Sequence, residues 1–111
     1  MSVYHDCLRA TSKCVATAER CAAVCGSSGD AQHERCAMLA RDCADVGRLV
    51  VALILRQSPH AASACLLHAE TCDAFADSCA KWPNDACCRD AMKAALACAV
   101  ACRSCRSMAA A

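Results

Sequence analysis

Residues 65–79 decide the fold, and they read Cys65-Leu-Leu-His-Ala-Glu-Thr-Cys72-Asp-Ala-Phe-Ala-Asp-Ser-Cys79. The three cysteines of this stretch are seven residues apart, and seven residues make two turns of an α-helix. The spacing therefore predicts a helix that carries its thiols along one face. Neither a sustained polar–apolar alternation nor many β-branched residues favour a strand.

The same seven-residue step recurs along the chain, which has fourteen cysteines among 111 residues. The other runs are Cys7, Cys14 and Cys21; Cys36 and Cys43; and Cys98 and Cys105. The cysteines outside the runs are Cys25, Cys87, Cys88 and Cys102. Four runs predict four helices, each with cysteine on the face that packs into the core.

Turn-forming residues separate these helices. We expect helices over residues 3–25, 31–57, 59–82 and 85–108. The expected N-caps are Ser2, Asp30, Ser58 and Asn84. Pro59 should open the third helix, and Gly26 should end the first in a left-handed conformation. Because every connection is short, the sequence predicts one all-α domain over residues 1–111, an antiparallel up-down-up-down four-helix bundle.

Composition limits the function. The chain is 58% hydrophobic but only 3% aromatic, and its net charge is +1. Such a charge balance argues against a nucleic-acid binder and gives no reason to expect a membrane surface as partner. Residues 1–25 contain no apolar segment of a secretory signal, so we expect the cytosol, where thiols stay reduced. The apolar run Leu49–Leu55 is too short to span a bilayer, and we expect it to form a subunit interface.

Antiparallel packing gathers the thiols into layers. One end of the bundle should hold Cys21, Cys25, Cys36, Cys79, Cys87 and Cys88. The middle should hold Cys14, Cys43, Cys72 and Cys98, and the other end Cys7, Cys65, Cys102 and Cys105. A second core position on the four helices carries Thr11 and Ala18, Ala40 and Gly47, His68 and Phe75, and Ala91 and Ala95. The core is therefore expected to be only partly lined with sulfur.

Soft thiolates select Cu(I), Zn(II) or iron–sulfur clusters. Zinc sites usually pair cysteines on tight turns, whereas the C-x2-C pair Cys102/Cys105 lies inside a predicted helix. Ferredoxin-type cysteine runs are absent. Cu(I) accepts two or three bridging thiolates, and pairs such as Cys21/Cys25, four residues apart on one helix, suit it. We therefore predict several Cu(I) ions per chain, with all fourteen cysteines and His68 as candidate ligands, and zinc as the alternative metal.

Other interpretations stay open. Buried cysteine also serves as a small hydrophobic residue, and a disulfide framework would need a geometry that stacked helix faces rarely offer. A redox enzyme would use Cys102/Cys105 or Cys87/Cys88; only the second pair begins a helix, where the dipole favours a reactive thiolate. His68 is either a metal ligand or a core histidine with satisfied hydrogen bonds. The expected surface histidines are His5, His33 and His60, and the expected core-filling methionines are Met38 and Met92.

The chain resembles the Csp copper storage proteins, which are cysteine-rich four-helix bundles. The segments that carry the resemblance are Cys36-Ala-Met-Leu-Ala-Arg-Asp-Cys43-Ala-Asp-Val, Arg56-Gln-Ser-Pro-His-Ala-Ala, Cys65-Leu-Leu-His-Ala-Glu-Thr-Cys72 and Cys98-Ala-Val-Ala-Cys102-Arg-Ser-Cys105-Arg-Ser-Met108. The resemblance implies a cytosolic homotetramer that stores or detoxifies Cu(I) rather than an enzyme, with a copper chaperone as a possible partner. The chain departs from the family pattern, which favours cysteine, at Ala40, Gly47, His68, Phe75, Ala91 and Ala95. We therefore expect fewer copper ions than the pattern implies.

Overall fold

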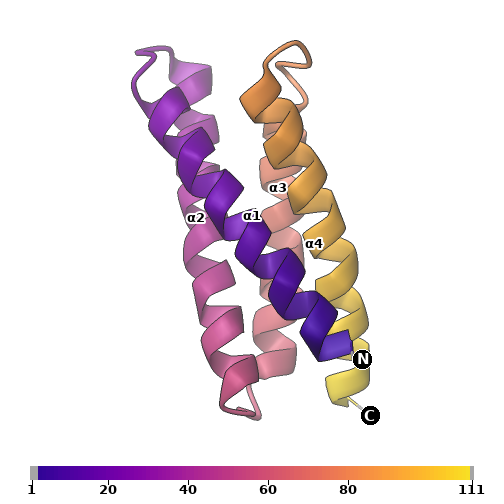
Figure 1. Cartoon of the computed structure of the whole chain (residues 1–111). Coiled ribbons are helices and arrows are strands. Elements are labelled where there is room, and N and C mark those ends of the chain that lie inside the picture. Colours follow the sequence, from indigo (N-terminus) through magenta and orange to yellow (C-terminus); the bar gives the residue numbers. More distant parts are fainter. Residues whose placement is uncertain (1–2, 111) are drawn as a thin grey trace.

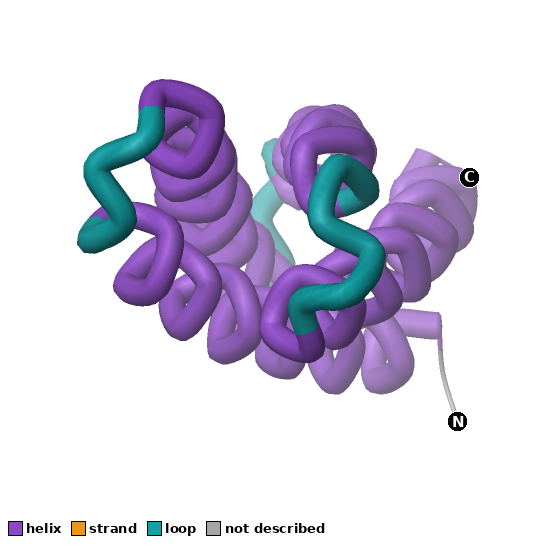
Figure 2. Tube along the Cα trace, turned by 90° about the horizontal axis from the view of Figure 1, so that it is seen from above, coloured by secondary structure: helices purple, strands orange, loops and turns teal. Residues whose placement is uncertain are grey.

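Four antiparallel helices make up the part of the chain that the computed structural model describes, residues 3–110, with side chains described for residues 4–105. They are α1 (Val3–Gly26), α2 (Ala31–Leu55), α3 (Ala61–Cys79) and α4 (Ala86–Ala110), and no strand occurs within residues 3–110. The bundle measures 44 × 19 × 17 Å (Figure 1). Helix α1 packs against α2 and α4, and α3 packs against the same two helices (Figure 2). The predicted all-α four-helix bundle is confirmed.

The start of α2 follows the sequence prediction. The side chain of Asp30 accepts a hydrogen bond from the backbone N–H of Gln32 at 2.9 Å, and the backbone of Asp30 is extended as an N-cap requires. The predicted cap Ser2 lies outside the described residues. Gly26 is the last residue of α1 rather than a left-handed stop, because the positive φ of this connection falls on Gly29, at 76°.

The end of α2 comes two residues earlier than predicted because the chain turns at Gln57, whose φ is 55°. The N–H of Gln57 donates to the carbonyl of Ile54, and the N–H of Ser58 donates to the carbonyl of Leu53. These two bonds form a Schellman motif, which usually places glycine at the left-handed position. The predicted start of α3 at Pro59 was also wrong: Ser58 accepts from the N–H of His60, and the helix begins at Ala61.

The connection between α3 and α4 is longer than predicted. Helix α3 ends at Cys79 rather than Trp82, because the chain goes into turns before Pro83. Asp85, not Asn84, caps α4: its carboxylate accepts from the N–H of Cys88 at 3.0 Å. Both residues are good caps by type, and the register of α4 decides which one meets the helix N-terminus.

The core is built from small side chains. Every cysteine except the half-buried Cys87 is buried, and so are all eight residues of the second core position. Phe75 is the largest fully buried side chain, followed by His68 and Val50. Alanine, glycine and cysteine keep the helices close together, so one aromatic ring and one imidazole fill the space that remains.

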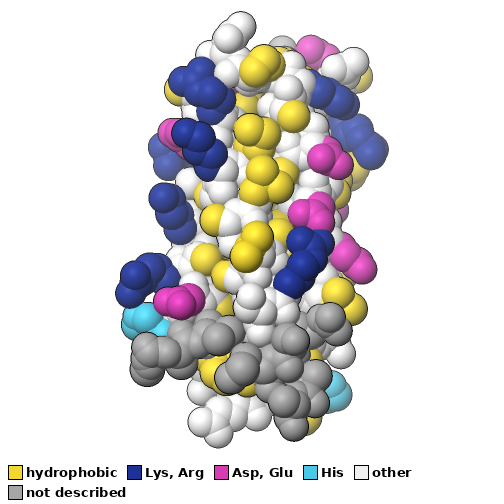
Figure 3. Space-filling model, turned by 90° about the vertical axis from the view of Figure 1, so that its right-hand side faces the viewer, with side chains coloured by type: hydrophobic (Ala, Val, Ile, Leu, Met, Phe, Trp, Pro, Cys, Tyr) yellow, Lys and Arg dark blue, Asp and Glu magenta, His cyan; other side chains and the backbone are white. Residues whose placement is uncertain are grey.

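The surface carries charged side chains and several apolar ones. Met38 is 50% exposed, so its predicted place in the core was wrong, whereas Met92 is partly buried against the core. Leu49 and Leu55 are exposed at opposite ends of the apolar run in α2. Figure 3 shows a band of hydrophobic side chains along the side of the bundle where α4 lies, flanked by charged groups. Within the described residues, no helix has both the length and the apolarity needed to cross a bilayer.

Candidate metal centre

The first group of thiols lies at the end of the bundle that carries the α1–α2 and α3–α4 connections. The sulfurs of Cys21, Cys36 and Cys79 lie within 4.8 Å of one another, and those of Cys21, Cys25 and Cys88 do so as well. Cys21 belongs to both triads, and its Sγ is 3.8 Å from that of Cys25. The predicted layer therefore forms with five of its six cysteines, whereas Cys87 is in neither triad.

The middle of the bundle contains a ring of sulfur from all four helices. The Sγ atom of Cys43 lies 3.6 Å from that of Cys14 and 3.7 Å from that of Cys72. Cys14, Cys72 and Cys98 also form a set of donors with His68 in which all ligand atoms lie within 4.8 Å of one another. The structure thus brings the four predicted cysteines of the middle layer together and adds an imidazole to them.

His68 is fully buried and touches sulfur with both ring nitrogens. Its Nδ1 lies 3.4 Å from Cys102 Sγ and 3.5 Å from Cys98 Sγ. Its Nε2 lies 3.6 Å from Cys72 Sγ and 3.1 Å from the carbonyl oxygen of Cys43. The imidazole therefore has satisfied hydrogen bonds and also lies among potential metal ligands. This geometry is compatible both with a core histidine and with a metal ligand.

The second end of the bundle holds Cys7, Cys65 and Cys102, whose sulfurs lie within 4.8 Å of one another. Cys105 is buried beside Cys7 and Cys65. The hydroxyl of Thr11 connects this group to the middle ring, because it lies 3.9 Å from Cys7 Sγ and 3.4 Å from Cys98 Sγ. Sequence patterning placed Thr11 in the core, but it gave no sign of this polar link.

Each group contains at least one sulfur that is poised as a thiolate. Hydrogen bonds from neighbouring thiols are the main reason that four pKa values fall far below the usual range, those of Cys7, Cys36, Cys43 and Cys98. In the first group, for example, Cys21 and Cys79 donate to Cys36. Burial alone would lower the pKa of His68, but hydrogen bonds to the sulfurs of Cys43 and Cys98 raise it to about 10. A cationic imidazole thus faces sulfurs with thiolate character.

Three of the four cysteines proposed as redox centres are buried with raised pKa values, whereas Cys87 is half-buried at the first turn of α4. Cys102 and Cys105 are fully buried, and their pKa values are raised, by hydrogen bonds to Cys65 and by burial respectively. Burial and the charge of Asp85 raise the pKa of Cys88 to about 12. A catalytic cysteine needs an accessible thiolate. All fourteen cysteines are free thiols in the structure.

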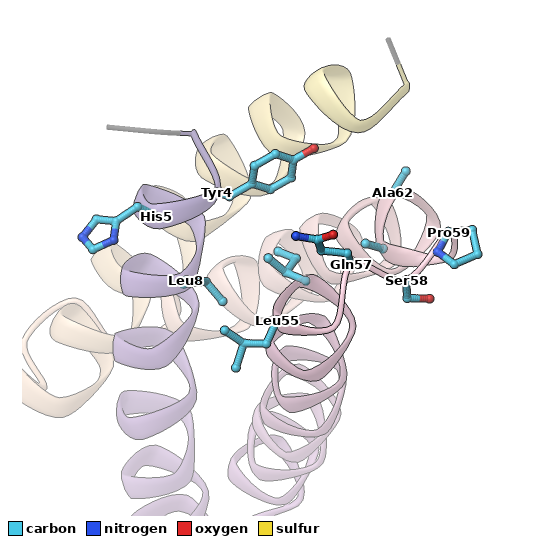
Figure 4. A pocket seen from close by; sticks show the side chains of 10 residues that line it. Tyr4, His5, Leu8, Leu55, Gln57, Ser58, Pro59 and Ala62 are labelled. Carbon is cyan, nitrogen blue, oxygen red and sulfur yellow. The ribbon is translucent and has the colours of Figure 1, made fainter.

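The other histidines lie near the two ends of the bundle. The ring of His33 stacks on the ring of Trp82, with centroids 4.1 Å apart. The Nδ1 atom of His33 lies 3.0 Å from an Asp30 carboxylate oxygen. His5 lies 2.9 Å from a guanidinium nitrogen of Arg9. At the end of the bundle near Cys7, a cavity of about 630 Å³ opens between the start of α1 and the α2–α3 connection (Figure 4). Its lining has no cysteine; Tyr4, His5, Leu8, Leu55 and Gln57 are among the residues that form it.

Fold and site together define a class of protein, a four-helix bundle whose core is lined with reduced thiols. Comparison with known proteins agrees with this class. A family model described as copper storage protein, Csp, matches residues 1–110. The chain belongs to this family.

Individual relatives cover nearly the whole chain. The Cu(I)-bound copper storage protein BsCsp3 is 30% identical and superposes with a TM-score of 0.84, over 93% of this chain and 97% of that one. The uncharacterized cysteine-rich protein YhjQ of Bacillus subtilis is 32% identical over 94% of this chain and 97% of its own length. The Nmul_A1745 protein of Nitrosospira multiformis is 25% identical, with a TM-score of 0.84 over 96% of both chains.

Proposed function

We propose that this protein stores several Cu(I) ions per chain in its core and thereby buffers or detoxifies copper. The observation that carries the proposal is the grouping of twelve buried cysteines into sets whose sulfurs lie within bridging distance, such as the 3.6 Å between Cys14 and Cys43. A soft monovalent ion is stabilised by two or three thiolates and tolerates shared sulfurs. Copper bound by a relative of 30% identity supports the same cargo.

Loading begins at the sulfurs whose thiolate form is already favoured. Cys36 accepts hydrogen bonds from its neighbours in the first group, and Cys7 does so in the last. A Cu(I) ion that binds such a thiolate displaces the hydrogen bonds that the neighbouring thiols donate to it. The neighbouring thiols then lose their protons as they bind the ion themselves. The protons leave to solvent, so the affinity for copper should rise with pH.

The residues proposed as ligands are the fourteen cysteines and His68. Thirteen of the thiols are buried in the core, and Cys87 is half-buried at the first turn of α4. Once its imidazole has lost a proton to solvent, His68 would supply a nitrogen to copper held by Cys98 or Cys72. Storage rather than catalysis suits this arrangement, because the ligands fill the core and leave no place for a substrate beside the metal.

We also propose a cytosolic location and a homotetramer. Reduced thiols persist in the cytosol, and a core of free thiols requires such conditions. The exposed Leu49 and Leu55 of α2 provide apolar surface for contact between subunits. A copper chaperone that carries Cu(I) on thiolates is the corresponding delivery partner, since ligand exchange between thiolates releases no free ion.

An anaerobic titration against chelators of known affinity tests the proposal. Reduced protein should take several Cu(I) ions per chain from a competing chelator. The triple variant Cys14→Ser, Cys43→Ser, Cys98→Ser, with circular dichroism to confirm its fold, should take fewer. Binding of at most one Cu(I) per chain by the wild type would rule out storage.

Zinc is the second candidate, and one observation favours it. Cys14, His68, Cys72 and Cys98 offer four donors within 4.8 Å of one another, which is the number and spacing of a tetrahedral site. Repeating the titration with Zn(II) separates the metals. We expect zinc to occupy this one tetrad, whereas Cu(I) should fill the remaining groups as well.

A further inference from the structure

The thiols of the core fall into two sets. The upper compartment, at the top of the bundle in Figure 1, consists of Cys21, Cys25, Cys36, Cys79 and Cys88. The lower compartment consists of His68 with Cys7, Cys14, Cys43, Cys65, Cys72, Cys98, Cys102 and Cys105. The sulfur–sulfur contacts of 3.6–3.9 Å, such as Cys21–Cys25 and Cys98–Cys102, each join two members of one compartment.

The lower compartment is continuous although it spans two layers of cysteine. Cys98 and Cys102, four residues apart on α4, have their sulfurs 3.9 Å apart, and Cys102 lies 3.9 Å from Cys7. His68 touches Cys102 with Nδ1 and Cys72 with Nε2. A copper ion can therefore move from the middle ring to the end of the bundle by short steps between adjacent donors.

The layer between the two compartments contains no such donor at its centre. On α3, Phe75 lies three residues after Cys72 and four before Cys79, and it is fully buried. The corresponding buried positions on the other helices are Ala18, Ala40, Ala91 and Ala95. At these core positions all four helices place only carbon between the middle ring and the upper compartment, and the buried hydroxyl of Thr17 on α1 donates to the carbonyl of Cys14. The layer below the ring, by contrast, contains an imidazole, a hydroxyl and a thiol.

The width of this apolar layer exceeds the reach of one ion. Seven residues of helix separate Cys72 from Cys79, which is about 10 Å at 1.5 Å per residue. Two sulfurs bound to one metal ion at about 2.3 Å each are at most about 4.6 Å apart. A Cu(I) ion that crossed the layer would have to leave all its thiolates beside a phenyl ring, and an unligated cation in an apolar medium is strongly disfavoured.

We propose that Phe75 and the alanines around it divide the core into two copper stores that do not exchange ions through the core and that fill from opposite ends of the bundle. This inference rests on the proposed function. Phe75 has the decisive position because it is the largest fully buried side chain of the core, and it occupies a place where a cysteine would continue the row of thiols from Cys72 to Cys79.

Withdrawal of copper by an excess of a strong chelator tests the division. We expect release from the loaded wild-type protein in two phases. Cys36→Ala should reduce the amplitude of one phase only, Cys7→Ala should reduce the other only, and the losses should add in the double variant. Phe75→Cys should merge the two phases, whereas the matched control Phe75→Leu, which keeps the layer apolar, should leave them separate.

The outcomes separate this inference from the proposed function. Several Cu(I) ions per chain with a change of both phases in Cys36→Ala would overturn the division and leave storage standing. Unchanged separate phases in a folded Phe75→Cys protein would also overturn it. If Phe75→Cys does not fold, the additivity of Cys36→Ala and Cys7→Ala decides. Binding of at most one Cu(I) by the wild type would instead overturn storage itself.

Discussion

The imidazole of His68 occupies space that the missing side chain of Gly47 leaves open. A Cβ atom at Gly47 would lie 3.0 Å from His68 Nε2 and 2.6 Å from Val15 Cγ2. Gly47 is therefore not a passive replacement of a cysteine. It lets α1, α2 and α3 approach one another around the buried histidine.

This close approach predicts the effect of adding a methyl group. Gly47→Ala gains about 1 kcal/mol in helix propensity. Overpacking a filled core costs about 1–3 kcal/mol, and the contact with the branched Val15 cannot relax by moving a flexible end. We expect a net loss of up to about 2 kcal/mol in the free energy of unfolding, measured by urea denaturation of the reduced apoprotein.

The control removes the obstacle. In the Val15→Ala background the closest contact of the new Cβ disappears, so Gly47→Ala should cost less there than in the wild type. Equal costs in both backgrounds would show that the clash does not determine the choice of glycine.

Phe75 should dominate the stability of the upper half of the core. Truncating a fully buried phenylalanine to alanine costs about 3–5 kcal/mol, because the lost burial and the remaining cavity both destabilise the fold. Phe75→Leu keeps most of the volume and should cost less than about 1.5 kcal/mol. Thermal unfolding of the two variants measures the difference; a small effect of Phe75→Ala would mean that the alanine layer can collapse around the gap.

The backbone at the end of α2 offers a stabilising substitution. Gln57 adopts a φ of 55°, a conformation that costs an ordinary residue roughly 1 kcal/mol and glycine almost nothing. Gln57→Gly should therefore raise the free energy of unfolding by about 0.5–1 kcal/mol, less the entropy that glycine adds to the unfolded chain. The opposite change, Gly29→Ala at a φ of 76°, should destabilise the protein. The same sign for both substitutions would contradict this explanation.

Asp30 should make part of the stability depend on pH. The N–H of Gln32, and then His33, hold the pKa of this carboxyl below its ordinary value. Its contribution is therefore present above the unfolded pKa of about 3.9 and is lost as the pH falls through the folded pKa. Asp30→Asn keeps an acceptor for the cap and should flatten this acid dependence, whereas Asp30→Ala should destabilise α2 at neutral pH as well. Denaturation at neutral and acidic pH compares the three proteins, and an unchanged acid dependence in Asp30→Asn would exclude the carboxyl as its source.

Much of the fold and of the thiol layers could be predicted from the sequence, because both depend on the helical period. A step of seven residues fixes which face of a helix carries Cys14 or Cys72, and short connections fix the antiparallel order. Details that depend on backbone conformation at helix ends were not predictable in this way. Asn84 and Asp85 are adjacent residues of similar capping ability, and no pattern indicated that Gln57 would adopt a left-handed conformation.

The type of metal ligand in the core could be predicted from the sequence, but the contacts that join or separate the layers of ligands could not. Residue type identified soft ligands, and spacing placed Phe75 and His68 at the second core position of one helix. Which of them joins two layers and which separates them depends on contacts between helices, such as the 3.4 Å between His68 Nδ1 and Cys102 Sγ. Such contacts depend on the rotation of each helix about its axis, which sequence periodicity fixes only to within a face.

Native mass spectrometry of the reduced protein, exposed to excess Cu(I) without oxygen and then desalted, tests copper storage most directly. The mass gives the number of copper ions on each chain and the number of protons that they displaced. Our account predicts several Cu(I) ions per chain, proton loss that increases with each ion, and a smaller number of ions in the Cys14→Ser, Cys43→Ser, Cys98→Ser variant. A wild-type chain that retains one copper ion or none, or that retains the same number as this variant, would contradict it.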